Sequence, residues 1–184
     1  MKIFIGGSAN EDIPEKYIKE ANKLGEKLLQ TEHEIYCCAS KVGLVGSIYN
    51  HFYKEAKDRV KSVVPKAHSH YSKNIEDIDV ITDTIGQRTD YVLQNCDLAI
   101  FLPGGIGTLY EILCAIETKR AKEHSCKLVI VNMFGYFDEL IAMLEKVFEE
   151  KFASKNDREM YTVVNEIEEL WFWKDWQNPK KCIK

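Results

Sequence analysis

The sequence lacks an excess of basic residues. Its 25 lysine and arginine residues are outnumbered by 29 aspartate and glutamate residues, which leaves a net charge of −4. Proteins that bind nucleic acid usually present a basic face, so we expect no nucleic-acid partner. A small anionic ligand is compatible with this charge, because one arginine and one helix terminus can supply positive charge locally.

Long apolar runs are also missing. A membrane-spanning helix needs about 20 predominantly apolar residues, and no run in the sequence approaches that length. The first apolar stretch, Lys2–Ile5, is too short for the apolar core of a signal peptide. We therefore expect no membrane association and a cytoplasmic location.

None of the cysteines forms a Cys-x-x-Cys pair. Most of them lie in apolar patterns typical of strands or helices, which favours reduced, mostly buried thiols. The six are Cys37, Cys38, Cys96, Cys114, Cys126 and Cys182. The adjacent thiols of Cys37 and Cys38 could instead be reactive.

Histidines with metal-ligand spacing are scarce as well. His68 and His70 flank Ser69, but no carboxylate or cysteine stands at a suitable spacing from them. Such a pair is more typical of a polar loop than of a metal site. We expect neither a metal nor an organic cofactor.

What is present fits one globular domain over residues 1–184. Hydrophobic residues make up 45% and charged residues 29%, which is an ordinary balance for a globular protein. A domain contains about 150 residues on average, and a chain of this length can bury a core without disulfides. No repeat or linker divides the sequence.

Short apolar runs alternate with longer amphipathic stretches. Strands are predicted over Lys2–Ile5, His33–Cys38, Val60–Val64, Ile78–Ile81, Leu98–Leu102, Leu128–Val131 and Tyr161–Val164. Helices are predicted over Pro14–Gln30, Val45–Lys57, Thr84–Asn95, Leu109–Lys122, Phe137–Phe152 and Glu166–Lys174, and a loop over Lys66–Glu76. This alternation predicts an α/β fold with a doubly wound, mostly parallel sheet. The continuously apolar strands fit a sheet that is covered on both faces.

Glycine loops follow the first strand and the fourth major strand. They are Gly6–Ser8 and Pro103–Gly105. In the commonest strand order these two strands are neighbours, and ligands bind in the crevice beyond their carboxyl ends. Gly104, Gly105 and Gly107 would allow close approach of a ligand and positive φ angles. The start of the next helix would offer free N–H groups, so the loop predicts a phosphate site. A tight strand-to-helix turn without a ligand is the alternative.

Thr108 and Glu111 fit the spacing of a capping box. In that interpretation Thr108 caps the helix and the Glu111 side chain reaches back to the Thr108 N–H. The carboxylate would then lie at the mouth of the anion site, where the helix dipole favours its ionised form. A role as base or as stabiliser of a cation would suit it.

Arg88 lies close to an apolar stripe on its predicted helix. The stripe consists of Ile85, Val92 and Cys96, and Arg88 falls within about 60° of it at about 100° per residue. A guanidinium directed inward needs an anionic partner. Alternatively, the side chain extends past its apolar neighbours to water.

These residues together resemble the LONELY GUY (LOG) family, whose members were once described as lysine decarboxylases. Residues 103–111, Pro-Gly-Gly-Ile-Gly-Thr-Leu-Tyr-Glu, are similar to the family signature PGGxGTxxE. Arg88 stands where the family has the arginine of an M-x-x-R-K motif. Weaker similarities are Gly6–Ser8, Gly43–Gly46 and Gly135–Asp138. The resemblance covers most of the chain.

The resemblance implies a Rossmann-like three-layer sandwich, a homodimer and a phosphoribohydrolase. Such an enzyme cuts the N-glycosidic bond of a nucleoside 5′-monophosphate, which gives free base and ribose 5-phosphate. By the resemblance Arg88 and Glu111 are the catalytic pair. The phosphate is held by Gly104, Gly105, Gly107 and Thr108, and Gly7 and Ser8 contact the substrate. In some family members the base is a cytokinin.

Several positions depart from the family pattern. Cys37–Val42 replaces a glycine run, Tyr110 replaces a glutamate, and Thr89 replaces the lysine after the motif arginine. These departures leave the base open. Two other functions remain as alternatives: a nucleotide or molybdenum-cofactor carrier without turnover, and a nucleoside 2-deoxyribosyltransferase.

Overall fold

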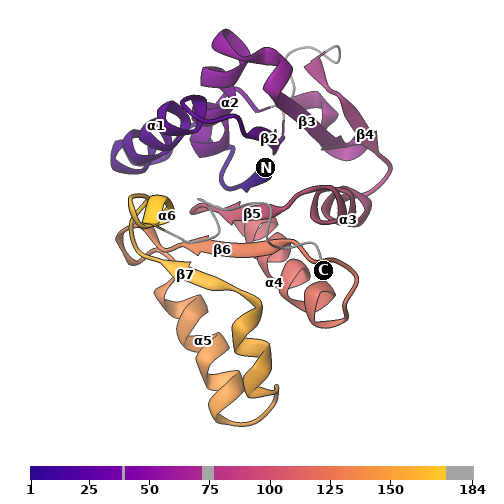
Figure 1. Ribbon diagram of the computed structural model, residues 1–184, viewed down its shortest axis with the longest axis vertical. Coiled ribbons are helices and arrows are strands. Elements are labelled where there is room, and N and C mark those ends of the chain that lie inside the picture. Colours follow the sequence, from indigo (N-terminus) through magenta and orange to yellow (C-terminus); the bar gives the residue numbers. More distant parts are fainter. Residues whose placement is uncertain (39, 72–76, 173–184) are drawn as a thin grey trace.

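Seven strands form one parallel sheet in the order β4-β3-β2-β1-β5-β6-β7 (Figure 1). The computed structural model describes residues 1–38, 40–71 and 77–172. The strands are β1 (Lys2–Gly6), β2 (Glu34–Cys37), β3 (Val60–Pro65), β4 (Val80–Thr82), β5 (Leu98–Phe101), β6 (Lys127–Val131) and β7 (Thr162–Val164). Each neighbouring pair is parallel. The predicted parallel α/β sheet is therefore confirmed.

Helices connect the strands, as the alternating pattern predicts. The α-helices are α1 (Glu15–Leu29), α2 (Gly43–Glu55), α3 (Ile85–Asn95), α4 (Ile106–Arg120), α5 (Asp138–Glu149) and α6 (Glu169–Phe172). Short 3₁₀ turns are η1 (Lys57–Arg59), η2 (Lys66–Tyr71), η4 (Met133–Gly135) and η5 (Lys155–Met160). Within the described residues, no helix is both long and apolar enough to cross a bilayer.

Most boundaries differ from the predictions by one to three residues, and three of the differences bear on the interpretation of loops and helix ends. The segment predicted as a loop over Lys66–Glu76 begins with the 3₁₀ turn η2, and residues 72–76 lie outside the described part. The predicted last helix, Glu166–Lys174, starts only at Glu169, and residues from 173 onwards are likewise outside it. Helix α4 starts at Ile106, three residues before the predicted Leu109. Thr108 therefore lies inside the helix and not at its start.

The core has two halves, one on each face of the sheet. Along β5, Leu98 and Ile100 point into one half, while Ala99 and Phe101 point into the other. Buried residues of α1 and α2 belong to the first half, and buried residues of α3 and α4 to the second. Side chains alternate along a strand, so apolar residues at every position of β5 serve both halves. The fold is the three-layer, Rossmann-like sandwich that the resemblance implies.

The strand order reverses between β1 and β5. From β1 the chain builds outward through β2, β3 and β4, and then returns to place β5 on the other side of β1. Phe4 is paired with Ala99, and Gly6 with Phe101. The connections on either side of this point run in opposite directions, and in open α/β sheets such a reversal marks the crevice where ligands bind, beyond the carboxyl ends of the strands. The predicted adjacency of the first and fourth major strands is confirmed.

Candidate functional site

The two glycine loops meet at the carboxyl ends of β1 and β5. The Ser8 N–H donates to the Pro103 carbonyl at 3.0 Å, and the Leu102 N–H donates to the Gly6 carbonyl at 2.9 Å. A side chain at Gly104 would fill this junction, because a Cβ there would lie 3.0 Å from the Ser8 nitrogen. The two loops therefore pack directly against each other at this end of the sheet.

Ser8 is also tied to the start of α2. Its carbonyl accepts from the N–H groups of Leu44 at 2.9 Å and Val45 at 3.3 Å. Gly43 has a φ of +73°, and a Cβ there would approach the Ser8 carbonyl oxygen to 2.5 Å, so glycine is needed at this position. The Ser8 hydroxyl accepts from the Asn10 N–H at 3.2 Å, and among the described residues no acceptor is seen for its own proton, so it could donate to a ligand.

Helix α4 starts without a side-chain cap directly after Pro103–Gly105, the loop that the sequence predicts to bind an anion and that is called the anion loop for this reason. Its N-cap residue is Gly105, with a φ of −84°. In the described part of the chain, no backbone carbonyl outside the helix accepts from the N–H groups of Gly105, Ile106, Gly107 or Thr108. The first N–H groups of a helix need partners from elsewhere, and an anion is a suitable one.

The predicted capping box of Thr108 and Glu111 is wrong. The helix has already begun at Ile106, so Thr108 is its third residue and lies buried. Its hydroxyl occupies the space beside Gly104, where a Cβ would approach it to 2.1 Å. The Glu111 carboxylate does not return to the helix start, because it pairs with Arg88 instead.

Positive φ angles are not the reason for the loop glycines, contrary to the prediction. None of Gly104, Gly105 and Gly107 has one. Gly104 is needed for the tight contact with Thr108, whereas a Cβ at Gly105 or at Gly107 would meet nothing within 4 Å. Beside these last two glycines the loop borders open space that a ligand could occupy.

Arg88 and Glu111 form a buried ion pair between α3 and α4. Only 7% of the Arg88 side chain and 13% of the Glu111 side chain are exposed. The guanidinium carbon lies 4.7 Å from the centre of the Phe4 ring, and Nε faces the Val63 carbonyl at 3.4 Å. Burial lowers the pKa of the guanidinium below its ordinary value, but an arginine stays charged at neutral pH. Of the two alternatives for Arg88, the inward direction is confirmed.

The other oxygen of Glu111 points to the glycine loop of β1. A Cβ at Gly6 would lie 2.8 Å from Oε2. Glu111 is one turn along α4 from Gly107, a rise of about 6 Å along the axis. The carboxylate thus lies about one turn from the uncapped start of α4 and next to the loop that follows β1.

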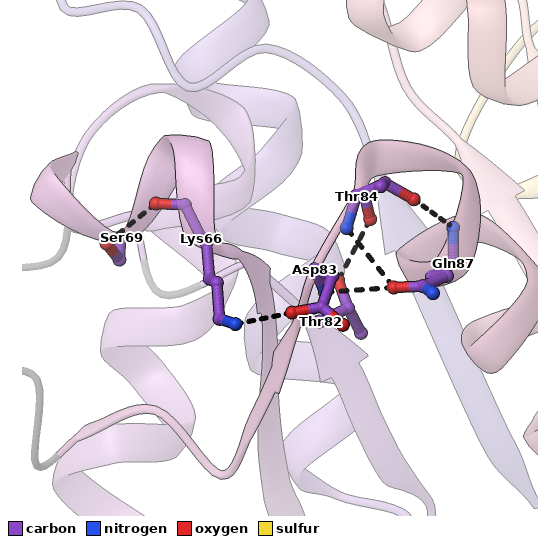
Figure 2. Close-up of polar contacts among 6 residues, drawn as sticks. All are labelled: Lys66, Ser69, Thr82, Asp83, Thr84 and Gln87. Atoms are coloured by element: carbon purple, nitrogen blue, oxygen red, sulfur yellow. Dashed lines mark hydrogen bonds and ion pairs between the residues drawn. The ribbon is translucent and has the colours of Figure 1, made fainter.

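The start of α3, which carries Arg88, is fixed by a capping box that the prediction did not identify. The Thr84 hydroxyl accepts from the Gln87 N–H at 3.1 Å, and Gln87 Oε1 accepts from the Thr84 N–H at 3.3 Å (Figure 2). An ion pair between Lys66 and Asp83 links the ends of β3 and β4 beside it (Figure 2). The spacing Thr-x-x-Gln is the sequence signal that indicates such a cap.

The apolar stripe predicted beside Arg88 is only partly buried, so this prediction was partly wrong. Val92 and Cys96 are buried, as predicted, but 41% of Ile85 is exposed. Ile85 is the first residue of α3. The inward direction of Arg88 therefore depends on Glu111 and not on a continuous apolar face.

Tyr136 contacts the anion loop, and the sequence interpretation gave it no role beyond a motif similarity. Its hydroxyl donates to the Gly104 carbonyl at 2.8 Å. It follows β6, the strand next to β5. A tyrosine just beyond a strand is a weak signal in a sequence, because the sequence does not indicate which group its hydroxyl contacts.

A separate cavity of about 580 Å³ lies beyond the carboxyl ends of β6 and β7. Glu20 and Lys23 of α1 line it together with Asn132, Phe134 and neighbouring residues. Neither Arg88 nor Glu111 borders it. The buried ion pair and the uncapped helix start are more specific chemical features than the lining of this cavity. We therefore place the candidate site beyond the carboxyl ends of β1 and β5.

Most of the described cysteines are buried, which makes their thiols poorly reactive. Cys37, Cys96 and Cys126 are buried, as predicted, and Cys38 and Cys114 are half-buried. Burial raises the pKa of the Cys37 and Cys96 thiols well above the ordinary value, and that of Cys126 to about 12. Buried thiols of this kind stay protonated and react poorly. Cys182 lies outside the described residues.

Comparisons with known proteins agree with this architecture. The sequence model of the family described as "possible lysine decarboxylase" matches residues 45–172. Cytokinin riboside 5′-monophosphate phosphoribohydrolase LOG1 from Arabidopsis thaliana is 26% identical over 91% of this chain and 78% of its own. A probable enzyme of the same name, LOGL6 from Oryza sativa subsp. japonica, is 26% identical over 91% and 67%.

Solved structures share the fold. The molybdenum cofactor binding protein from Rippkaea orientalis has a TM-score of 0.64 and 16% identity, with 93% of each chain covered. The molybdenum cofactor carrier protein from Chlamydomonas reinhardtii has a TM-score of 0.64 and 16% identity over 91% of each chain. At this identity the likeness concerns the fold alone.

Glu111→Gln should lower the free energy of unfolding by about 3 kcal/mol or more, because Arg88 is left buried without its counter-charge. Urea denaturation followed by circular dichroism measures this. The double variant Arg88→Met/Glu111→Gln removes both charges and should recover most of the loss. As a control, Glu117→Gln breaks an exposed pair with Arg120 and should leave stability essentially unchanged. Equal losses in the single and double variants would contradict the expectation.

Proposed function

The chain belongs to the LOG family, and on that premise we propose that it is a phosphoribohydrolase that cleaves the N-glycosidic bond of nucleoside 5′-monophosphates. Water would add to the anomeric carbon while the bond from that carbon to the base nitrogen breaks. The products would be ribose 5-phosphate and the free base, which takes up a proton.

One observation carries this proposal: a buried carboxylate–guanidinium pair lies one helical turn below a helix end that has no cap. The free N–H groups suit a phosphate, and the carboxylate suits a centre of positive charge nearby. A ribose 5-phosphate joins two such groups, a dianionic phosphate and an anomeric carbon that becomes cationic during cleavage.

The phosphate would lie over the start of α4. Its oxygens would accept from the N–H groups of Gly105, Ile106, Gly107 and Thr108, which no backbone carbonyl outside the helix uses within the described residues. The positive end of the helix dipole favours the charge. Gly104 keeps the loop close to Thr108. On the facing loop, Gly7 and the Ser8 hydroxyl would contact the sugar.

Glu111 would stabilise the oxocarbenium-like state or orient the attacking water. A preorganised charge of this kind acts strongly because it is held in place and shielded from water. The adjacent guanidinium of Arg88 favours the ionised carboxylate. Once a nucleotide enters, Arg88 would also bind the phosphate or assist departure of the base.

The names of the relatives favour a cytokinin riboside monophosphate, or a related nucleotide, as the substrate. At 26% identity the base is a question for experiment. The sequence departs from the family pattern at Cys37–Val42, at Tyr110 and at Thr89, so the base need not be the one that the relatives release. A panel of bases therefore tests specificity directly.

The test incubates the purified protein with AMP, GMP, CMP, UMP and a prenylated AMP, and separates free base and ribose 5-phosphate by chromatography. We expect release from at least one nucleotide. Arg88→Ala and Glu111→Gln should each lower the rate by about 10²–10³. The double variant Arg88→Met/Glu111→Gln should be equally inactive although stably folded, and Glu117→Gln should keep full activity.

The outcomes separate the alternatives. Near-full hydrolysis by Glu111→Gln would contradict the assignment of this residue. Binding of nucleotide without release from any of the five would favour a binding or carrier protein without turnover, since one of the two solved structures is named a molybdenum cofactor binding protein and the other a carrier protein. Transfer of the sugar to a second base, in place of water, would favour a deoxyribosyltransferase.

We also propose that the protein is a homodimer, joined through an apolar surface on α3 and α4. Ile106, Tyr110 and Leu113 follow the spacing i, i+4, i+7 and form one stripe of α4, with exposed fractions of 82%, 42% and 47%. The Tyr110 hydroxyl lies 3.6 Å from the Cβ position of Gly86, so the stripe continues onto α3 and its exposed Ile85. Exposed apolar surface of this kind is typical of an interface.

Leu113→Glu should convert the dimer to a monomer in size-exclusion chromatography with light scattering, because it places a charge in the apolar stripe. The control is Met143→Glu on α5, where 59% of the methionine is exposed, and it should stay dimeric. Dissociation by the control alone would move the interface to α5, and a monomeric wild type would refute the dimer.

A further inference from the structure

Tyr136 lies between two loops that follow neighbouring strands. Its hydroxyl donates to the Gly104 carbonyl at 2.8 Å. Its ring packs edge-on against Phe137, with ring centres 5.0 Å apart, and against Tyr17 of α1 at 6.0 Å. These contacts hold the ring from two sides, so the hydroxyl is delivered to the anion loop from a fixed direction.

The backbone before Tyr136 is in an uncommon conformation. Phe134 has φ +54° and ψ +29°, and Gly135 has φ +73°. A left-handed conformation is rare for an aromatic residue. A side chain at Gly135 is disfavoured, because the residue has a φ of +73° and a Cβ would lie 2.6 Å from Asp138 Oδ2. The two left-handed residues turn the chain sharply after β6, and Tyr136 follows this turn.

Buried Asn132 holds the turn in place. Its Oδ1 accepts from the Phe137 N–H at 2.7 Å, and its Nδ2 donates to Asp138 Oδ1 at 2.8 Å. The Asn132 carbonyl accepts from the Gly135 N–H at 3.1 Å. The segment from Asn132 to Asp138 is thus fixed at both ends, which makes it a rigid support for the tyrosine.

The bond to Gly104 controls the neighbouring N–H group. The carbonyl of Gly104 and the N–H of Gly105 belong to one planar peptide unit, in which they point in opposite directions. A hydroxyl that holds the carbonyl on the Tyr136 side therefore directs the Gly105 N–H away from it. Both residues flanking this peptide are glycines, so without the bond the plane could rotate at little steric cost.

We propose that Tyr136 is a positioning residue of the phosphate site, which fixes the Gly104–Gly105 peptide so that the Gly105 N–H faces the anion. This inference rests on the proposed function, because it takes the loop at α4 as the phosphate site. Tyr136 itself does not touch the phosphate. It acts through the backbone, by keeping one donor in its binding orientation before the ligand arrives.

The test combines nucleotide affinity with a direct view of the amide. Tyr136→Phe removes only the hydroxyl and should weaken binding of AMP about 3- to 10-fold, the effect of one hydrogen bond. It should raise KM by the same factor and leave kcat and the melting temperature nearly unchanged. The control is Tyr17→Phe, which removes a hydroxyl from the adjacent ring of the same cluster and should leave AMP affinity as in the wild type.

Labelling with ¹⁵N-glycine gives ten amide signals at most, one for each glycine. The Gly105 signal is assigned from the variant Gly105→Ala, which should fold because a Cβ there meets nothing within 4 Å. Inorganic phosphate should shift the Gly105 signal in the wild type and in Tyr17→Phe. In Tyr136→Phe the signal should already differ before phosphate is added, and should respond only at higher concentration.

The possible failures are distinguishable. Equal AMP affinity and an equal Gly105 response in Tyr136→Phe and the wild type would overturn the role of Tyr136 while the phosphate site stands. A fall in kcat with unchanged affinity would overturn it too. If phosphate shifts no glycine amide in the wild type, the anion loop itself is refuted, and the positioning role falls with it.

Discussion

Two opposite charges lie side by side in the interior of this protein, and much of its architecture keeps them together. The side chains of Arg88 and Glu111 are almost fully removed from solvent. Either charge alone would be costly at that depth, so α3 and α4 must stay in register for the pair to form. The capping box of Thr84 and Gln87 fixes the start of α3, and the glycine junction at Gly104 fixes the start of α4. The pair is therefore a constraint on the fold, and it is also the chemical centre of the site that we propose.

The crevice is shaped by where side chains are missing. Gly6, Gly43 and Gly104 each leave space that another group of the protein occupies: the Glu111 carboxylate, the Ser8 backbone and the Thr108 hydroxyl. Gly105 and Gly107 leave space that no protein atom fills within 4 Å. The first group of glycines brings the loops together, and the second keeps the helix end open. This division explains how a tight turn and the proposed phosphate site can share one short sequence.

The sequence alone was sufficient for most of the fold. Apolar runs such as Leu98–Leu102 and the amphipathic stretches between them gave the parallel sheet and the adjacency of β1 and β5, because burial on both faces leaves a clear pattern. Local patterns failed where tertiary contacts decide. Thr108 and Glu111 have the spacing of a capping box, yet the Glu111 carboxylate forms an ion pair with Arg88 instead. Arg88 itself could not be placed from helix geometry, because the partner that draws it inward lies on another helix. The sequence did not indicate a role for Tyr136, because its contact with Gly104 joins two loops that lie far apart in the chain.

The most direct test of the site is a crystal structure of the protein with ribose 5-phosphate. The phosphate oxygens should lie within hydrogen-bonding distance of the N–H groups of Gly105 to Thr108, with the anomeric carbon facing the Glu111 carboxylate. A phosphate bound elsewhere, for example in the cavity beyond β6 and β7, with Arg88 and Glu111 still paired and out of contact with the sugar, would contradict the proposed site.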